Sequence, residues 1–190
     1  MKLFGETSTE QNTTLAQTTI ETYIAKIALG DKPALAALYE ATRAAVYGFA
    51  LSIVKNECDA EDVLQEAYVK IWSSSGSYNA QGKPMAWILT ITKNLARSTL
   101  RERAKTADIP EEDWQMFYAP TTGTSSEDRI VLQAAMSVLK DEERQIITLH
   151  AISGLKHMEI ARLLNLPLST VLSKYSRARK KLEAALKEGD

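Results

Sequence analysis

The residues best suited to do chemistry lie in a basic segment near the C-terminus, LNLPLSTVLSKYSRARKKL, at positions 164–182. This segment contains five lysine or arginine residues and no acidic residue, whereas the formal net charge of the whole chain is −1. Hydroxyl groups and long cations on a helix can contact phosphates, and lysine or arginine can also read guanine edges. The segment therefore indicates DNA binding rather than catalysis.

The surrounding sequence, GLKHMEIARLLNLPLSTVLSKYSRARKKL, has the pattern of a helix-turn-helix. Asn165 is expected to end the first helix because asparagine tolerates the left-handed backbone conformation. Pro167 prevents the helix from continuing through the turn, and Ser169 is expected to cap the second helix. An ordinary basic surface helix is the alternative interpretation of this motif.

The second helix of the motif divides into two faces. A stripe with spacings of 4, 3 and 4, typical of a buried helix face, is formed by Val171, Tyr175, Ala178 and Leu182. The other side offers hydroxyls near the helix start and cations further along. The residues predicted to contact DNA there are Ser169, Thr170, Ser173, Lys174, Arg177, Lys180 and Lys181.

A second basic stretch, residues 82–106, contains six lysine or arginine residues and one glutamate. Residues 107–128 lie between the two basic stretches and contain six acidic residues and no basic residue. This arrangement suggests a polyanion that is held at two places. Charge alone leaves open that both runs are only solvated helix faces, so the motifs must decide.

The elements that position these residues are predicted to be helices throughout. Apolar residues recur at helical spacing in five segments, and strand-like alternation is absent at useful length. Asp31, Asp59 and Asp141 are each expected to cap the helix that follows. The predicted fold class is therefore all-α, with two small helical domains joined by a flexible acidic linker.

The domain limits follow from composition. Residues 106–126 contain prolines, glycine and clustered Ser and Thr without a sustained period, which is typical of a linker. We expect a flexible N-terminus at 1–15, a helical domain at 16–105, the linker at 106–126 and the helix-turn-helix domain at 127–187.

Both domains resemble parts of bacterial sigma factors. DEERQIITLHAISGLKHMEIARLLNLPLSTVLSKYSRARKKL is similar to their C-terminal domain, which binds the promoter −35 element. GDKPALAALYEATRAAVYGFALSIVKNECDAEDVLQEAYVKIW, followed by PMAWILTITKNLARSTLRER, resembles their region 2. A short chain with only these two domains resembles the extracytoplasmic function (ECF) subfamily. The resemblance implies binding to core RNA polymerase, recognition of the −35 and −10 elements, and promoter opening.

The resemblance also implies residue roles in region 2. The matching acidic helix would bind the clamp helices of the beta-prime subunit through one face: Asp62, Gln65, Glu66 and Val69. The loop at 77–85 would take a base of the −10 element into a pocket formed by Tyr78 and Asn79, and Trp87 would pack in the core. The residues expected to hold the strand and nearby duplex are Lys93, Asn94, Arg97, Arg101 and Arg103. Further expected partners are the beta flap and an anti-sigma factor.

Three positions depart from the family pattern. Ser169 stands in place of a glycine at the start of the recognition helix, Leu172 in place of a basic residue, and Asn165 in place of a turn glycine. None of these residues is incompatible with the fold. Leu172 could contact a thymine methyl, so the −35 sequence of relatives does not transfer to this chain.

Two other classes of function compete with this interpretation. A dimeric helix-turn-helix repressor or activator is the alternative, but it leaves the acidic helix and the 77–85 loop unexplained. An enzyme is disfavoured because His150 and His157 are the only histidines, and neither a HExxH pattern nor a phosphate-binding glycine loop occurs. We expect no catalytic residue, no metal ligand and no cofactor. With Cys58 as the single cysteine and neither a signal peptide nor a long apolar run, a cytoplasmic location is expected.

Overall fold

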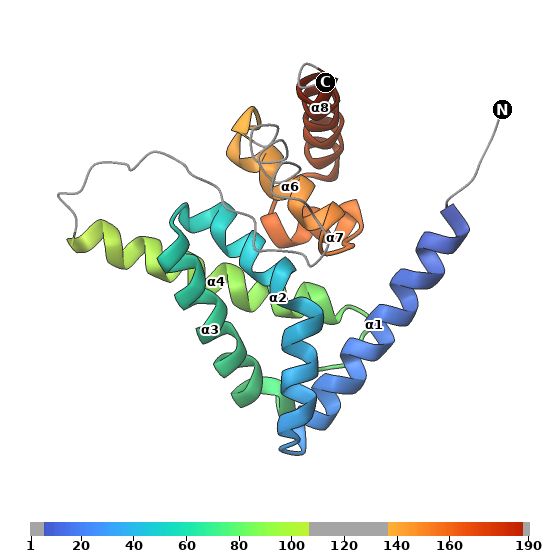
Figure 1. Cartoon of the computed structure of the whole chain (residues 1–190), viewed down its shortest axis with the longest axis vertical. Helices are drawn as coiled ribbons and strands as arrows, with labels where there is room; N and C mark the ends of the chain where they lie inside the picture. Colours follow the sequence, from blue (N-terminus) through green and yellow to red (C-terminus); the bar gives the residue numbers. More distant parts are fainter. Residues whose placement is uncertain (1–5, 107–136, 188–190) are drawn as a thin grey trace.

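The computed structural model describes residues 6–106 and 137–187, and all regular secondary structure in these residues is helical (Figure 1). This confirms the all-α prediction. The first segment contains α1 (Glu6–Ala28), α2 (Lys32–Val54), α3 (Glu57–Ser74), the short 3-10 helix η1 (Ser75–Ser77) and α4 (Pro84–Thr106). The second contains α6 (Asp141–Ala151), α7 (His157–Leu164) and α8 (Leu168–Lys187). Within these two segments, every helix is too short or too polar to cross a bilayer.

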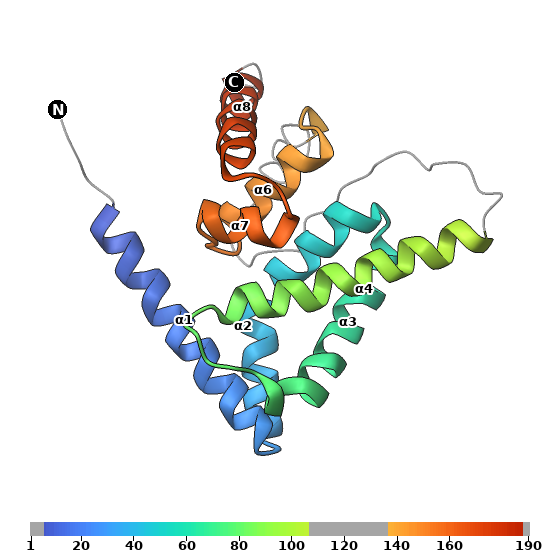
Figure 2. The same cartoon turned by 180° about the vertical axis from the view of Figure 1, so that it is seen from behind.

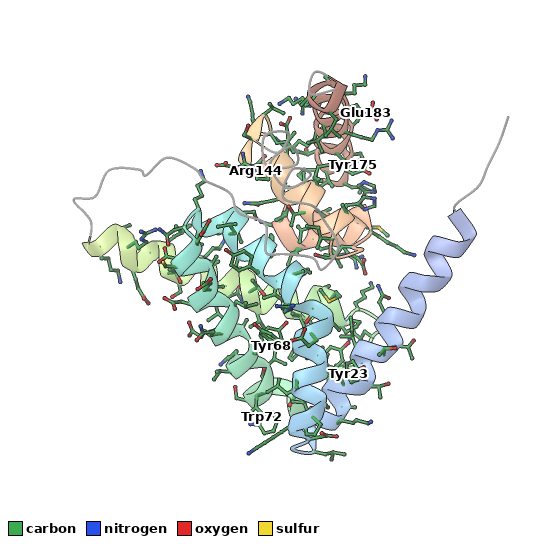
Figure 3. The ribbon with its side chains drawn as sticks, viewed as in Figure 1. Tyr23, Tyr68, Trp72, Arg144, Tyr175 and Glu183 are labelled. Carbon is green, nitrogen blue, oxygen red and sulfur yellow. The ribbon has the colours of Figure 1, made fainter. Side chains whose placement is uncertain are left out.

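Helix α2 lies at the centre of the first domain and packs against α1, α3 and α4 (Figure 1). Its Leu38 and Phe49 are fully buried together with Ile71 of α3 and Ile88 of α4. Burial of each such side chain contributes about 1.5–3 kcal/mol to folding, so these contacts fix the helices that carry the candidate site. Tyr68 of α3 lies in the same interior (Figure 3) and its hydroxyl is 2.7 Å from that of Thr42.

The helix caps only partly follow the prediction. Asp31 caps α2 as expected, because its carboxylate accepts a hydrogen bond of 3.0 Å from the backbone nitrogen of Ala34. The prediction for Asp59 is wrong. Asn56 has the extended backbone of a cap residue and its side chain accepts from the nitrogen of Asp59. Asp59 lies in the first turn and forms an ion pair with Arg103 instead.

Two further cap predictions are displaced by one or two residues. Helix α6 begins at Asp141 itself, so the cap position belongs to Lys140, whose backbone nitrogen donates to Glu143. Helix α8 begins at Leu168, and the nitrogen of Val171 donates to the carbonyl of Pro167. Pro167 therefore occupies the N-cap position predicted for Ser169, because its carbonyl accepts the first backbone hydrogen bond of the helix.

Helices α6, α7 and α8 form the second domain around buried Ile146, Leu149 and Ile160. Asn165 ends α7 with a left-handed backbone at φ 59° and ψ 46°, which confirms its predicted role. The tight turn from Asn165 to Pro167 sets the direction in which α8 leaves. The helix-turn-helix is thus formed by α7 and α8.

The two domains are in contact: α6 packs on α2, and α7 lies beside the N-terminal half of α4 (Figure 2). Lys55 Nζ is 2.6 Å from Asp141 Oδ2, and Gln145 Nε2 donates to the carbonyl of Ser52 at 3.3 Å. Nearly all of the predicted linker lies outside the described residues, so the domain limits stay predictions. The N-terminal part of α1 overlaps the stretch predicted to be flexible. That prediction arose because the apolar spacing of this segment starts only at Ile20.

Candidate nucleic-acid interface

Helix α8 has a buried side and an exposed side, as its sequence predicts. Val171 and Ala178 are fully buried, and Tyr175 and Leu182 are half-buried. Tyr175 lies on the side of α8 that faces the rest of its domain (Figure 3). Between positions 169 and 180, the exposed residues of α8 are Ser169, Leu172, Ser173, Ser176, Arg177, Arg179 and Lys180.

Two of the predicted DNA contacts are already held by acidic residues of α6. Lys174 Nζ lies 2.7 Å from Glu142 Oε2, and Lys181 Nζ lies 2.7 Å from Glu143 Oε2. Lys174 and Lys181 are seven residues apart and so share a helix face, which is turned towards α6. Thr170 is half-buried at the same border. The structure thus brings Ser169, Ser173, Arg177 and Lys180 together on the open face, but not Thr170, Lys174 and Lys181.

Glu143 is the buried member of these ion pairs, with its side chain only 5% exposed. Burial alone would raise its pKa. The hydrogen bonds from Lys181 and from the backbone nitrogen of Lys140, with the nearby charges of Lys181 and Arg177, instead lower the pKa of Glu143 below its usual value. Glu143 is therefore ionised at neutral pH and fixes α8 to α6.

Sequence reasoning missed Ser176 on the exposed face of α8. Ser169, Ser173, Ser176 and Lys180 follow one another at spacings of 4, 3 and 4, which is one continuous helical stripe. The same spacing test that identified the buried stripe would have found Ser176. Its hydroxyl is the kind of short polar group that contacts phosphates or base edges.

The basic residues of α4 also divide by face. Asn94, Arg97 and Arg101 are exposed and are spaced by 3 and 4, so they lie on one side of the helix. Thr90, which the sequence analysis overlooked, is exposed and extends this stripe by one turn. Arg103 lies on another side, where its Nη1 is 2.7 Å from Asp59 Oδ2.

Lys93 lies at the edge of this stripe and contacts the second domain. Its Nζ donates a hydrogen bond of 2.6 Å to the carbonyl of Leu163, at the end of α7. Burial, and to a lesser degree the charge of Arg97, lowers the pKa of Lys93 below its usual range. A residue predicted to hold promoter DNA is thus engaged by the helix-turn-helix domain.

The loop between η1 and α4 places the two predicted pocket residues differently. Asn79 is exposed, whereas Tyr78 is half-buried. The Tyr78 hydroxyl donates to Glu21 Oε1 at 2.9 Å, and its ring lies 4.9 Å from that of Trp87 between centroids. Burial first, and then the hydrogen bond to Glu21, raises the pKa of Tyr78 far above its usual value. Trp87 packs against the core, as expected.

The predicted polymerase contacts lie on the outer face of α3. Asp62, Gln65, Glu66 and Val69 are all exposed, and Val69 is 68% exposed despite being apolar. The opposite face is buried through Val63, Ala67 and Ile71. The four residues thus form one exposed acidic surface with a single apolar residue, Val69, and they take no part in the core.

The rings of the two histidines, His150 of α6 and His157 of α7, pack against each other. The rings of His150 and His157 are stacked at 4.5 Å, and the ring of Tyr175 meets each of them edge-on. Among the described residues, His, Cys, Asp and Glu side chains nowhere gather in a group that could hold a metal ion.

Family comparisons match both domains separately. Residues 38–106 match the model of sigma-70 region 2, and residues 129–182 match the model of sigma-70 region 4. An ECF RNA polymerase sigma factor, SigK of Mycobacterium sp. strain KMS, is 27% identical over 164 residues, covering 83% of this chain and 85% of the relative.

Two solved structures share the fold. RpoE of Bartonella quintana, solved with the anti-sigma factor NepR, superposes with a TM-score of 0.61 and 27% identity, covering 75% of this chain and 90% of that one. CnrH, solved with the cytosolic domain of CnrY, superposes with the same TM-score of 0.61 at 24% identity, covering 90% of this chain and 99% of that one.

Proposed function

Because this chain belongs to the ECF group of sigma-70 factors, we propose that α3, α4 and α8 divide the work of promoter recognition among three exposed faces. As a sigma factor, the protein binds core RNA polymerase and directs it to promoter DNA. The observation that carries the residue assignment is the pair of exposed polar and basic stripes, one on α4 and one on α8, each in a domain that matches a sigma region.

Helix α8 is the proposed −35 reader. Ser169, Ser173, Ser176, Arg177 and Lys180 would face the major groove, where serine and lysine contact phosphates and arginine can bind guanine by two hydrogen bonds. Lys174 and Lys181 would support this face from behind through their ion pairs with α6. Leu172 is 47% exposed at the border of the stripe and could meet a thymine methyl.

The loop at 78–83 and helix α4 are the proposed −10 site. Asn94, Arg97 and Arg101 would hold the backbone of the separated strand, while the loop takes up one base. Lys93 would join them once its bond to Leu163 is released. Arg103, which is paired with Asp59, would act from the side of the helix that faces α3.

The exposed acidic face of α3 is the proposed contact to the beta-prime clamp helices, with Val69 as its apolar centre. The second domain would contact the beta flap. This role in the cytoplasm requires no chemistry of the chain's own, so we propose that the protein is not an enzyme. RpoE and CnrH were each solved with another protein, and RpoE's partner is an anti-sigma factor, which supports control of this chain by a partner of that kind.

In vitro transcription tests this proposal. The purified chain is added to core RNA polymerase and fragmented DNA from the source organism, and transcript starts are sequenced. We expect discrete starts preceded by two dissimilar elements, absent without the chain. Protection of two symmetric half-sites, without added initiation, would instead support a dimeric regulator. The matches to two different sigma regions do not favour that alternative.

A further inference from the structure

A carboxylate outside the matched region reaches the proposed −10 loop. Glu21 lies in α1, whereas the region 2 match begins at residue 38. Its Oε1 accepts two hydrogen bonds of 2.9 Å, one from the Tyr78 hydroxyl and one from the backbone nitrogen of Gly82. One oxygen atom therefore holds both ends of the segment from Tyr78 to Gly82, which includes the exposed Asn79.

Helix α1 is a firm base for this contact. Ile20, Ile24 and Ile27 are buried in the core, at 7%, 1% and 2% exposure. Glu21 follows directly after the first of these residues and is half-buried. A side chain on a helix that is packed so tightly has little freedom to move and can hold a loop in one place.

The geometry of the loop depends on the two hydrogen bonds that Glu21 accepts. Gly82 has a left-handed backbone, with φ of +68°, and no atom beyond its two chain neighbours lies within 4 Å of the position where a side chain would begin. The turn is therefore not held by packing at Gly82, and its backbone nitrogen is bonded to Glu21 instead. The Tyr78 side chain is held in turn by the bond of its hydroxyl to Glu21 and by the contact of its ring with Trp87.

A negative charge beside a nucleic-acid site needs a reason, because it repels phosphates. The two hydrogen bonds supply that reason. We propose that Glu21 is a positioning residue for base capture: it holds Tyr78 and Gly82 so that the −10 loop is already shaped before the strand arrives. This inference rests on the proposed function of the 78–83 loop. In this proposal Tyr78 lines the side of the base pocket with its ring, because its hydroxyl already donates to Glu21.

The variants separate the hydrogen bonds from the charge. Glu21→Ala removes both bonds, whereas Glu21→Gln keeps an oxygen that can accept from Tyr78 and Gly82. Tyr78→Phe removes one bond and keeps the ring. Glu40→Ala is the matched control, because Glu40 is an exposed helical glutamate that pairs only at the surface with Arg43.

Binding is measured with holoenzyme on fork DNA whose non-template −10 strand is single-stranded. The readout is the ratio of affinities for the preferred base and for a substituted base at the captured position. For Glu21→Ala we expect this ratio to fall about tenfold, from the loss of two hydrogen bonds that order the loop. Glu21→Gln and Glu40→Ala should retain most of the discrimination, and Tyr78→Phe should lose part of it. Core polymerase binding should be unchanged in all four.

A spectroscopic signal makes the positioning role visible in the full chain. With Trp72 and Trp114 replaced by Phe, emission reports on Trp87, which the Tyr78 ring contacts. Glu21→Ala should shift this emission, and Glu21→Gln should restore it.

The outcomes are distinct. If wild-type holoenzyme shows no base preference on the fork DNA, the proposed function of the loop fails. If the wild type discriminates and Glu21→Ala does so equally well, the positioning role is refuted while the function stands. A loss in Glu21→Gln as large as in Glu21→Ala would also refute it, as would a loss of core binding.

Discussion

Cations on the same helix have different neighbours, and their substitutions should differ accordingly. Arg177 is exposed and donates through Nε to the carbonyl of Ser173, one turn before it. Arg177→Ala should reduce −35-dependent initiation by about tenfold through loss of a DNA contact, because such a contact contributes about 1–3 kcal/mol. Binding to core polymerase should not change. In vitro transcription measures initiation and pull-down with core enzyme measures polymerase binding, and an equal loss in both would contradict the assignment.

Lys181 presents the opposite case. Its partner Glu143 is 5% exposed, so Lys181→Met would leave a buried carboxylate without its main counter-charge. We expect a loss of about 1–3 kcal/mol in the stability of the second domain, reduced by the partial exposure of Lys181. Thermal unfolding measures this loss. The control is Lys180→Met, because Lys180 is an exposed neighbour of Lys181. It should leave the unfolding temperature unchanged and weaken DNA binding.

The stacked histidines predict a pH dependence. Burial, and then the neighbouring His150, lowers the pKa of His157 below its ordinary value of about 6.5. The unfolded chain therefore binds a proton at a higher pH than the folded one, so stability is full above about pH 6.5 and falls as the pH drops towards the folded pKa. Thermal unfolding from pH 7.5 to 5.5 should show this decline.

His157→Phe keeps a ring against His150 and Tyr175 but cannot be protonated. We expect the decline between pH 7.5 and 5.5 to be smaller in this variant than in the wild type. Glu143 also loses its contribution on acidification, but only below the ordinary pKa of a glutamate, which is about 4.3. An identical pH profile in both proteins would show that His157 is not the responsible group.

At the scale of the helix, the outer face of α3 can be tested without disturbing the fold. Asp62 and Glu66 are exposed and are one turn apart. Asp62→Lys with Glu66→Lys should abolish binding to core polymerase, because the acidic face would become basic and repel a basic partner. Pull-down with core enzyme measures the effect.

The control is Glu40→Lys with Glu61→Lys. These residues are also exposed and give the same change in net charge, but Glu61 is turned by about a quarter of the helix from the proposed face. Core binding should persist in this control. Unchanged pull-down with the Asp62 and Glu66 variant would remove the proposed role of α3.

Helical patterns were predictable where spacing alone decides them. The buried stripe of α8 and the ends set by Asp31 and Asn165 follow from the chemistry of a few adjacent residues. The start of α3 did not, because Asn56 and Asp59 can both cap and local sequence does not rank them.

Contacts between distant helices could not be predicted in the same way. Glu142 and Lys174 meet only because α8 packs on α6, and Glu21 lies 57 residues before Tyr78. These contacts decide which cations of the candidate site face outward and how its loop is held. The exposed and buried faces of the helices could therefore be predicted from the sequence, whereas the contacts between helices that hold the site in place could not.

The whole molecule adds a constraint that neither domain carries alone. Lys93 Nζ is 2.6 Å from the carbonyl of Leu163, and five residues later α8 begins at Leu168. Five residues span at most about 18 Å. The names of the −35 and −10 elements place them about 25 base pairs apart, which is roughly 85 Å along B-form DNA at about 3.4 Å per base pair. The two proposed DNA faces therefore cannot occupy both elements while the domains stay in contact.

A disulfide across the domain contact tests this conclusion. A Cβ at Gly48 would lie 3.5 Å from Thr148 Cγ2, so Gly48→Cys and Thr148→Cys should be able to bond across α2 and α6. Cys58, which is exposed, is replaced by Ser in this variant. The oxidised protein should not form open complexes on a two-element promoter, and a reductant should restore them. Gly48→Cys alone is the control for the substitution. Full activity of the crosslinked protein would mean that promoter recognition does not require the domains to separate.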